Sequence, residues 1–310
     1  MRVFLACSAV CLVSVLSGCG KHSASGVSIH RDLRKLVSPD TTALAGCDLD
    51  RLKVTDFYKR HQAQLNIPLI DGVAQQSGFD PRRNLTELLV TWNGKDLFFA
   101  TRGNFKQQQI ENQLAKSSKP VPFEGHTLFT DSKGAFAFLD DHVAIAGQRS
   151  SVENVIEGQS RDEMPDELAH RLAGMSEGNQ IWMVSRGSLP FADMHMRSDY
   201  ASILANFVGF IKGTSTGIEA GSGIHLKSEI DCVSDEGAKR VNDALRGGIG
   251  LARLSTKDDQ LDMLKAYDAI HVTKDNQAVY VDANLSADLV DKLLGHVVSF
   301  DFSGRFQPNH

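Results

Sequence analysis

The chain has 310 residues, of which 42% are apolar and 23% charged, with a formal net charge of −5. This composition is typical of a globular protein, and the length indicates one large domain or two smaller ones. A mildly acidic chain lacks the clustered lysine and arginine that nucleic-acid backbones require, so we expect no nucleic-acid partner. Beyond the N-terminus, no stretch approaches the roughly 20 apolar residues of a membrane-spanning helix.

The N-terminus has the pattern of an export signal. Residues 3–16 are apolar and follow Met1-Arg2, which is the length of a signal-peptide hydrophobic region and too short for a spanning helix. Leu16-Ser17-Gly18-Cys19 follows directly. This string resembles the lipobox of bacterial lipoproteins, which implies that residues 1–18 are a lipoprotein signal peptide, cleaved before Cys19, and that the Cys19 thiol is lipidated. The alternative is an ordinary secretory signal in which Cys19 is incidental.

The resemblance also implies a location. A lipoprotein of this kind is anchored to a membrane of the cell envelope, and its folded part faces an extracytoplasmic compartment. Gly20 follows the cysteine where aspartate would mark retention, and similarity to enterobacterial sorting then implies the periplasmic face of the outer membrane. Several acyl chains anchor stably, because each buried methylene contributes about 0.8 kcal/mol. Residues 19–38 are therefore interpreted as the lipidated cysteine and a flexible tether.

Two thiols remain in the folded part. Cys7 and Cys11 leave with the signal peptide, which leaves Cys47 and Cys232. An exported compartment permits a disulfide between them, and it would close a loop of about 185 residues. The alternative is that both are free thiols, packed as small hydrophobic side chains. The sequence leaves both open, because it cannot place their Cα atoms within bonding distance.

The folded part appears as two successive series of similar elements. The first series, residues 39–158, predicts a strand at 42–49, a helix at 55–76, a hairpin at Asn93-Gly94, a helix from Asn104, a meander over 126–146 and a helix from Ser150. The second series, residues 179–310, predicts a strand at 180–185, a helix at 198–211, a hairpin over 216–232, a helix from Ser234 to Gly247, strands at 266–273 and 278–283, and a helix from Ser286.

These elements predict an α+β fold with a predominantly antiparallel sheet, helices on one face and a pattern present twice, with residues 159–178 as linker. Residues 224–232 show the clearest alternation, with apolar side chains on one face and His225, Lys227, Glu229 and Asp231 on the other. This alternation predicts that one face of the sheet is wet. Whether the halves share one sheet or form two lobes remains open.

No motif predicts a reaction. Gly213-Thr214-Ser215-Thr216-Gly217 matches the nucleophile-elbow string, but an elbow needs a strand before the serine and a helix after it, and the predicted order is the reverse. The histidines lack helical zinc spacing. Asp193-Met194-His195-Met196 has soft-metal ligand types, but its simpler interpretation is a loop packing two methionines. We therefore predict no catalytic residue, no cofactor and no metal site.

Two functional hypotheses follow. The first is a non-enzymatic binding or assembly module on a membrane surface, whose partner is an envelope protein or an apolar ligand near the apolar helix around residues 200–211. The alternative is a hydrolase with catalytic residues assembled from distant segments. A pocket containing hydrogen-bonded titratable groups would favour the hydrolase. The junction of the halves is the expected place for a ligand, because domain interfaces favour pockets.

Overall fold

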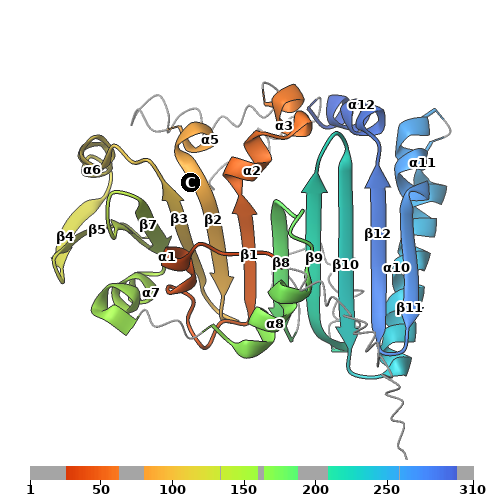
Figure 1. The fold of residues 1–310 in the computed structure, drawn as a ribbon, viewed down its shortest axis with the longest axis horizontal. Coiled ribbons are helices and arrows are strands. Elements are labelled where there is room, and N and C mark those ends of the chain that lie inside the picture. The colour runs from red at the N-terminus through yellow and green to blue at the C-terminus, as the bar shows by residue number, and fades with distance from the viewer. Residues whose placement is uncertain are drawn as a thin grey trace, which may run out of the picture.

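A single large sheet organises the chain. The computed structural model describes residues 26–62, 80–132, 134–159, 164–187, 209–257 and 259–298. Its sheet has twelve strands in the order β11-β12-β10-β9-β8-β1-β2-β3-β7-β6-β5-β4, and every neighbouring pair is antiparallel (Figure 1). The predicted α+β class with a predominantly antiparallel sheet is confirmed.

The described elements up to residue 159 are those of the first half and α1, which lies within the stretch 19–38 interpreted as tether but packs in the core, where Leu33 and Val37 are buried. They are α1 (Arg31–Arg34), β1 (Ala43–Asp48), α2 (Leu49–Lys53), α3 (Asp56–His61), α5 (Pro81–Asn84), β2 (Leu85–Trp92), β3 (Leu97–Gly103), α6 (Gln107–Leu114), β4 (Lys119–Phe123), β5 (His126–Thr130), β6 (Ala135–Phe138), β7 (Val143–Gly147), α7 (Arg149–Asn154) and the π-helical turn η1 (Val155–Gln159).

The linker and the second half contain the remaining elements. They are α8 (Asp166–Gly174), β8 (Ile181–Arg186), β9 (Ile211–Ala220), β10 (Ile224–Cys232), α10 (Asp235–Ser255), α11 (Leu261–Asp268), β11 (Ile270–Asp275), β12 (Ala278–Leu285) and α12 (Ala287–Val298). Among the described helices, none is long and apolar enough to cross a bilayer.

The two halves share this one sheet. Their first strands, β1 and β8, pair at its centre, with Ala43 opposite Ser185 and Cys47 opposite Ile181. Outward from this joint the order is β1-β2-β3-β7-β6-β5-β4 on one side and β8-β9-β10-β12-β11 on the other. The repeated pattern expected from the sequence is thus present as two similar strand orders that meet edge to edge.

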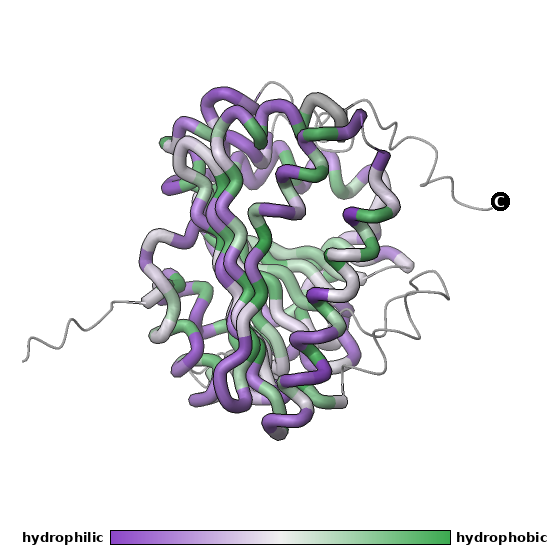
Figure 2. The backbone as a smooth tube through the Cα atoms, turned by 90° about the vertical axis from the view of Figure 1, so that its right-hand side faces the viewer, coloured by the Kyte–Doolittle hydropathy of each residue, from purple (hydrophilic) through white to green (hydrophobic). Residues whose placement is uncertain are grey.

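Helices pack against both faces of the sheet, so the prediction that they cover one face is wrong. Cross-strand partners point the same way, so Ser185, Thr214 and Ile230 share one face, while Trp182 and Val184 point to the opposite one. We call the face that carries Ser185 the α10 face and the face that carries Trp182 the α8 face, after the helix that packs on each. Figure 2 shows helical segments on either side of the strands.

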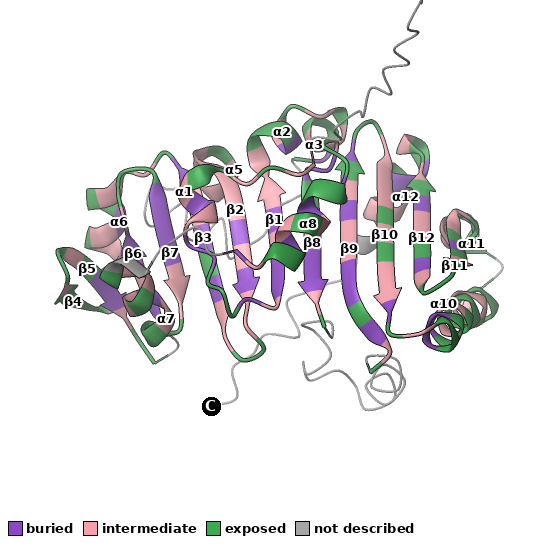
Figure 3. Ribbon diagram, turned by 60° about the horizontal axis from the view of Figure 1, so that its bottom comes forward, coloured by how far each residue is buried: buried purple, intermediate pink, exposed green. Residues whose placement is uncertain are grey.

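The largest core lies on the α8 face of the first half. Helices α1, α7 and α8 bury Leu33, Val152, Leu168 and Leu172 against strand residues such as Leu89 and Val184. Burial of this apolar surface contributes about 25 cal/mol per Å². On the α10 face, α10 packs Ala238 and Val241 onto β10, β11 and β12, and Ile110 of α6 packs near Phe138. Among strand residues at the centre of the sheet, Leu44, Leu89 and Val184 on the α8 face are fully buried, and Figure 3 marks the buried segments of these strands.

Several predicted boundaries are wrong. The helix predicted to stop at Gly247 continues as α10 to Ser255, because a glycine inside a helix weakens it without always ending it. The sequence missed α11, placed the following strand four residues early, and missed β4, an edge strand that tolerates Pro120 and Pro122. Of the predicted helix at 55–76, residues 56–61 form α3 and residues 63–76 lie outside the described part.

Substituting Gly248→Ala is expected to stabilise the protein by roughly 0.5–1 kcal/mol, because glycine costs that much relative to alanine inside a helix. Gly248 is exposed, and a Cβ atom there would have no neighbour within 4 Å. Urea unfolding followed by circular dichroism measures the change. A lower stability would show that α10 depends on the flexibility of its glycines.

A candidate polar binding pocket on the alpha8 face

The α8 face changes character in the second half of the sheet. There β10 presents His225, Lys227, Glu229 and Asp231, and the opposing residues on β12 include Tyr280 and Asp282. Lys227 and Glu229 are exposed, whereas Cys232 on the other face is buried. The alternation predicted for residues 224–232 thus produces the wet face that was expected.

This polar surface forms a pocket with a volume of about 550 Å³. Strands β9, β10 and β12 form its floor, and α8 with the following residues 174–179 forms its wall. The wall comes from the predicted linker and the floor from the second half. The pocket therefore lies beside the linker helix, not between the two halves as expected from the repeat.

Two glycines in β9 allow the wall to approach the floor closely. A Cβ atom on Gly213 would lie 2.2 Å from Arg171 Nη2, and one on Gly217 would lie 2.3 Å from Asn179 Nδ2. Real Cβ atoms do not approach other atoms so closely, so larger residues at either position would displace the wall. Arg171 donates to Asp231 at 2.6 Å and to Glu167 at 3.2 Å, which fixes α8 to β10.

Asn179 is the unusual group in the wall. It is 9% exposed, and its backbone N–H donates to the Ser176 carbonyl, but its side-chain amide has no hydrogen-bond partner in the described part of the chain. Its amide nitrogen and oxygen are not among the fully buried, unpartnered side-chain atoms of the described residues, so they remain accessible from the pocket. A side-chain amide provides two donors and an acceptor, so it could hydrogen-bond a ligand from this wall.

The floor contains two hydrogen-bonded pairs of titratable groups. His225 Nε2 lies 3.1 Å from Asp282 Oδ2, and the Tyr280 hydroxyl donates to Glu229 Oε1 over 3.5 Å. Desolvation and the neighbouring Glu229 and Asp275 carboxylates raise the pKa of Tyr280 above its ordinary value, so it remains a protonated donor at neutral pH. Tyr280 is 39% exposed, which leaves ring surface available to a ligand.

The histidine pair is incomplete as a catalytic unit. Within the described residues, no hydroxyl or thiol hydrogen-bonds to the second ring nitrogen of His225, as nucleophilic catalysis would require. Residues 213–217 lie inside β9. The serine of the elbow-like string is therefore not at a strand-to-helix turn, in agreement with the prediction. The start of this strand was predicted at Thr216, whereas β9 begins at Ile211. The described ranges also contain no group of His, Cys, Asp and Glu suited to a metal ion.

The thiols of Cys47 and Cys232 are free. Cys47 is on β1 and Cys232 on β10, three strand spacings apart in the sheet, which is roughly 14 Å. A disulfide needs Cα atoms within about 7 Å, so the geometry excludes the bridge and agrees with the free-thiol alternative. Sequence could not decide this, because the distance depends on strand order.

We expect Cys47 to react very slowly with iodoacetamide at pH 8. Burial, together with the Asp48 charge, raises the pKa of its thiol to about 11, so little reactive thiolate is present. Mass spectrometry of labelled protein, with and without urea, measures the effect. Two thiols of the folded domain should label only after unfolding, whereas rapid native labelling of Cys47 would contradict this environment.

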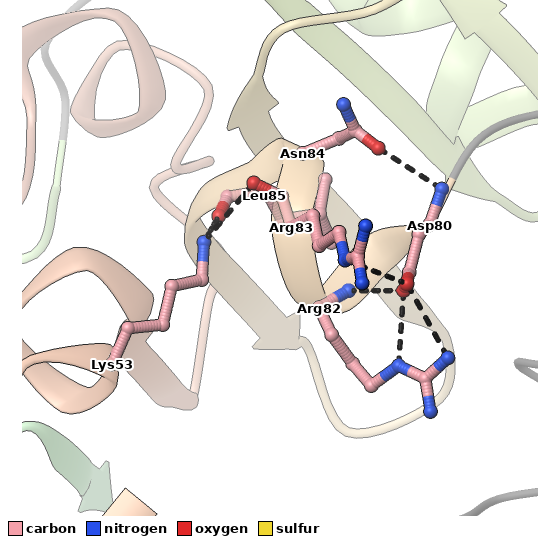
Figure 4. A network of polar contacts seen from close by, with 6 residues as sticks. All are labelled: Lys53, Asp80, Arg82, Arg83, Asn84 and Leu85. Atoms are coloured by element: carbon pink, nitrogen blue, oxygen red, sulfur yellow. Dashed lines mark hydrogen bonds and ion pairs between the residues drawn. The ribbon is translucent and has the colours of Figure 1, made fainter. Parts of the chain in front are cut away.

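A second polar cluster surrounds the start of β2 and is structural (Figure 4). Asp80 caps α5 by accepting from the Arg82 backbone N–H at 3.0 Å, and its own N–H donates to Asn84 Oδ1 at 3.0 Å. Lys53 donates to the carbonyl oxygens of Arg83 and Leu85, which ties α2 to this turn. Although desolvation opposes it, bonding to Arg82 holds the pKa of Asp80 below its usual value. Every group named here serves a turn or cap, so the cluster offers no ligand site.

Several predicted sites lie outside the described residues. They are the lipidation site Cys19, the 193–196 cluster and nearly all of the apolar helix at 198–211. One feature of the pocket could be predicted from the sequence, the alternation of polar side chains along β10. Nothing in the sequence pointed to Asn179, because its position over Gly217 depends on how the linker folds back on the sheet.

Comparison with protein-family models gives no match, and comparison with curated proteins gives none either. Among solved structures, the chain is similar to three crystal forms of a protein named TP0453. Form I has a TM-score of 0.43 at 8% identity, covering 89% of this chain and 96% of that one. Form III has a TM-score of 0.47 at 8% identity and covers 90% of this chain and 97% of that one. Form IV has a TM-score of 0.46 at 7% identity and covers 85% of this chain and 95% of that one.

Proposed function

We propose that this chain is a lipid-anchored extracytoplasmic binding module, which holds a small polar ligand in the pocket between α8 and strands β9, β10 and β12. The anchor part rests on the lipobox resemblance at Cys19. The binding part rests on one observation, the Asn179 amide, which lines the pocket from a largely buried residue and has no hydrogen-bond partner among the described residues. Such a group is stabilised when a ligand completes its hydrogen bonds.

The hydrogen-bonded titratable pairs of the pocket meet the criterion given above for the hydrolase, which therefore stays the alternative, and the same pairs also fit a binding site. Its charged groups pair with each other, as Arg171 does with Asp231 and His225 with Asp282, and these pairs hold the lining in place. An apolar ligand or envelope partner near residues 200–211 remains a separate prediction, because that segment lies almost entirely outside the described residues.

Saturation-transfer NMR on the full chain tests the binding part. The probes are four classes of small polar molecule: neutral glycosides, phosphorylated sugars, amino acids and polyamines. At least one class should bind the wild type, and Asn179→Leu should weaken that binding about tenfold or more, since loss of a buried hydrogen-bonding group costs about 1–3 kcal/mol. Binding by no class, or equal binding by the variant, would overturn the proposal.

The hydrolase alternative retains one specific observation, the His225–Asp282 pair in a pocket. It would need His225 to activate a water molecule, with Asp282 orienting the ring. Assays with chromogenic esters and glycosides, comparing wild type with His225→Gln, test it. Turnover that disappears in the variant would favour the hydrolase, and equal background rates in both would reject it.

A further inference from the structure

We infer that the ligand of the α8-face pocket is a neutral sugar ring. The inference rests on the proposed binding function and deepens it by naming the ligand class. It follows from three properties of the described lining: the distribution of charge, the exposed face of one aromatic ring and the free amide of Asn179.

The charges disfavour both kinds of ion. Four carboxylates line the pocket, from Glu219, Glu229, Asp231 and Asp282. They repel phosphate and carboxylate ligands. Arg171 in the wall directs its terminal nitrogens to Asp231 and Glu167, and its Nε, which has no partner among the described residues, is fully buried, so the guanidinium is not open to an anion.

A cationic ligand is disfavoured by the same surface. Lys227 projects from the middle of the floor, directly opposite Asp282 on β12 and two residues from both His225 and Glu229. It lines the pocket and makes no ion pair with any described residue. An ammonium ligand would have to lie beside this charge, and like-charge repulsion is an effective means of rejecting a ligand class.

What remains is an uncharged ligand with many hydroxyl groups. Carboxylates and His225 accept hydrogen bonds from hydroxyls, Lys227 donates them, and the Asn179 amide does both. One face of a sugar ring carries C–H groups with slight positive charge, which pack on the negative face of an aromatic ring. Tyr280 provides this surface, and its bond to Glu229 orients the ring in the floor.

The test compares four probes by saturation-transfer NMR with the full chain in a detergent that has no sugar headgroup. They are methyl β-glucopyranoside, its N-acetylglucosamine counterpart, glucose 6-phosphate and spermidine. We expect the two neutral glycosides to bind and the two ions not to bind. Tyr280→Leu should weaken glycoside binding about tenfold, whereas Tyr280→Phe, which keeps the ring, should stay within roughly threefold.

Phe99→Leu is the matched control. Phe99 is 40% exposed, close to the 39% of Tyr280, but it lies on the α10 face, so its substitution should leave glycoside binding unchanged. Binding of spermidine or glucose 6-phosphate, with loss in Asn179→Leu, would overturn the sugar assignment and leave the binding function standing. If none of the four probes binds, the sugar assignment is overturned. The proposed binding function then depends on whether amino acids, the remaining probe class, bind the wild type. If neither Tyr280→Leu nor Asn179→Leu changes glycoside binding, both the sugar assignment and the proposed binding function of the pocket are overturned.

Discussion

Trp182→Ala is expected to lower the free energy of unfolding by about 3–5 kcal/mol, the usual cost of removing a large buried aromatic side chain. Trp182 is 4% exposed and lies on β8, where the two halves of the sheet join. Its cross-strand partners are both glycines, Gly46 on β1 and Gly217 on β9. The indole occupies the space over Gly46, because a Cβ atom there would lie 2.2 Å from the ring.

The same geometry predicts the effect of filling that space. Gly46→Ala should destabilise the protein by about 1–3 kcal/mol through overpacking. Combined with Trp182→Ala, however, the added methyl group enters a vacated space, so the double variant should be more stable than the sum of the single effects predicts. Urea unfolding followed by far-ultraviolet circular dichroism measures all three variants without relying on the removed tryptophan.

Gly248→Ala is the control, since its added methyl group meets open space. A Trp182→Ala loss below about 1 kcal/mol would contradict a tightly packed joint, because ordinary surface substitutions stay within about 0.5 kcal/mol. Strict additivity of the Gly46 and Trp182 substitutions would show that the two positions are not in contact.

Cys19→Ala is expected to move the protein from the membrane fraction to the soluble fraction. The physical reason is that, under the proposed lipidation, the acyl chains supply the anchor. The measurement is fractionation of cells that express the wild type or the variant, with mass spectrometry of the purified N-terminus.

Cys11→Ala is the matched control, since it lies in the predicted signal peptide and should leave fractionation unchanged. Wild-type protein should begin at an acylated Cys19. Retention of Met1 in the mature protein, or membrane partition of Cys19→Ala equal to that of the wild type, would contradict lipidation. The pocket proposal would remain open to its own test, because it depends on the folded domain alone.

Much of the architecture could be predicted from local chemistry. The Asn93-Gly94 turn predicted the β2–β3 hairpin, and Ser234 predicted the start of α10, where its hydroxyl accepts from the Gly237 N–H. The alternation over 224–232 predicted which β10 side chains face solvent. These features were accessible because turns, caps and strand alternation depend on neighbouring residues.

The sequence alone predicted the α+β class with an antiparallel sheet and the repeated order of elements, and the lipid anchor stays a prediction from the sequence. Strand order was decided only by the tertiary structure: it joined the halves through β1 and β8, separated Cys47 from Cys232, and brought Asn179 over Gly217 to form a pocket wall. The reason is that hydrogen bonding along a strand edge is almost independent of side-chain identity. Packing across the whole sheet therefore selects which strand edges pair, and a local sequence pattern does not predict this pairing.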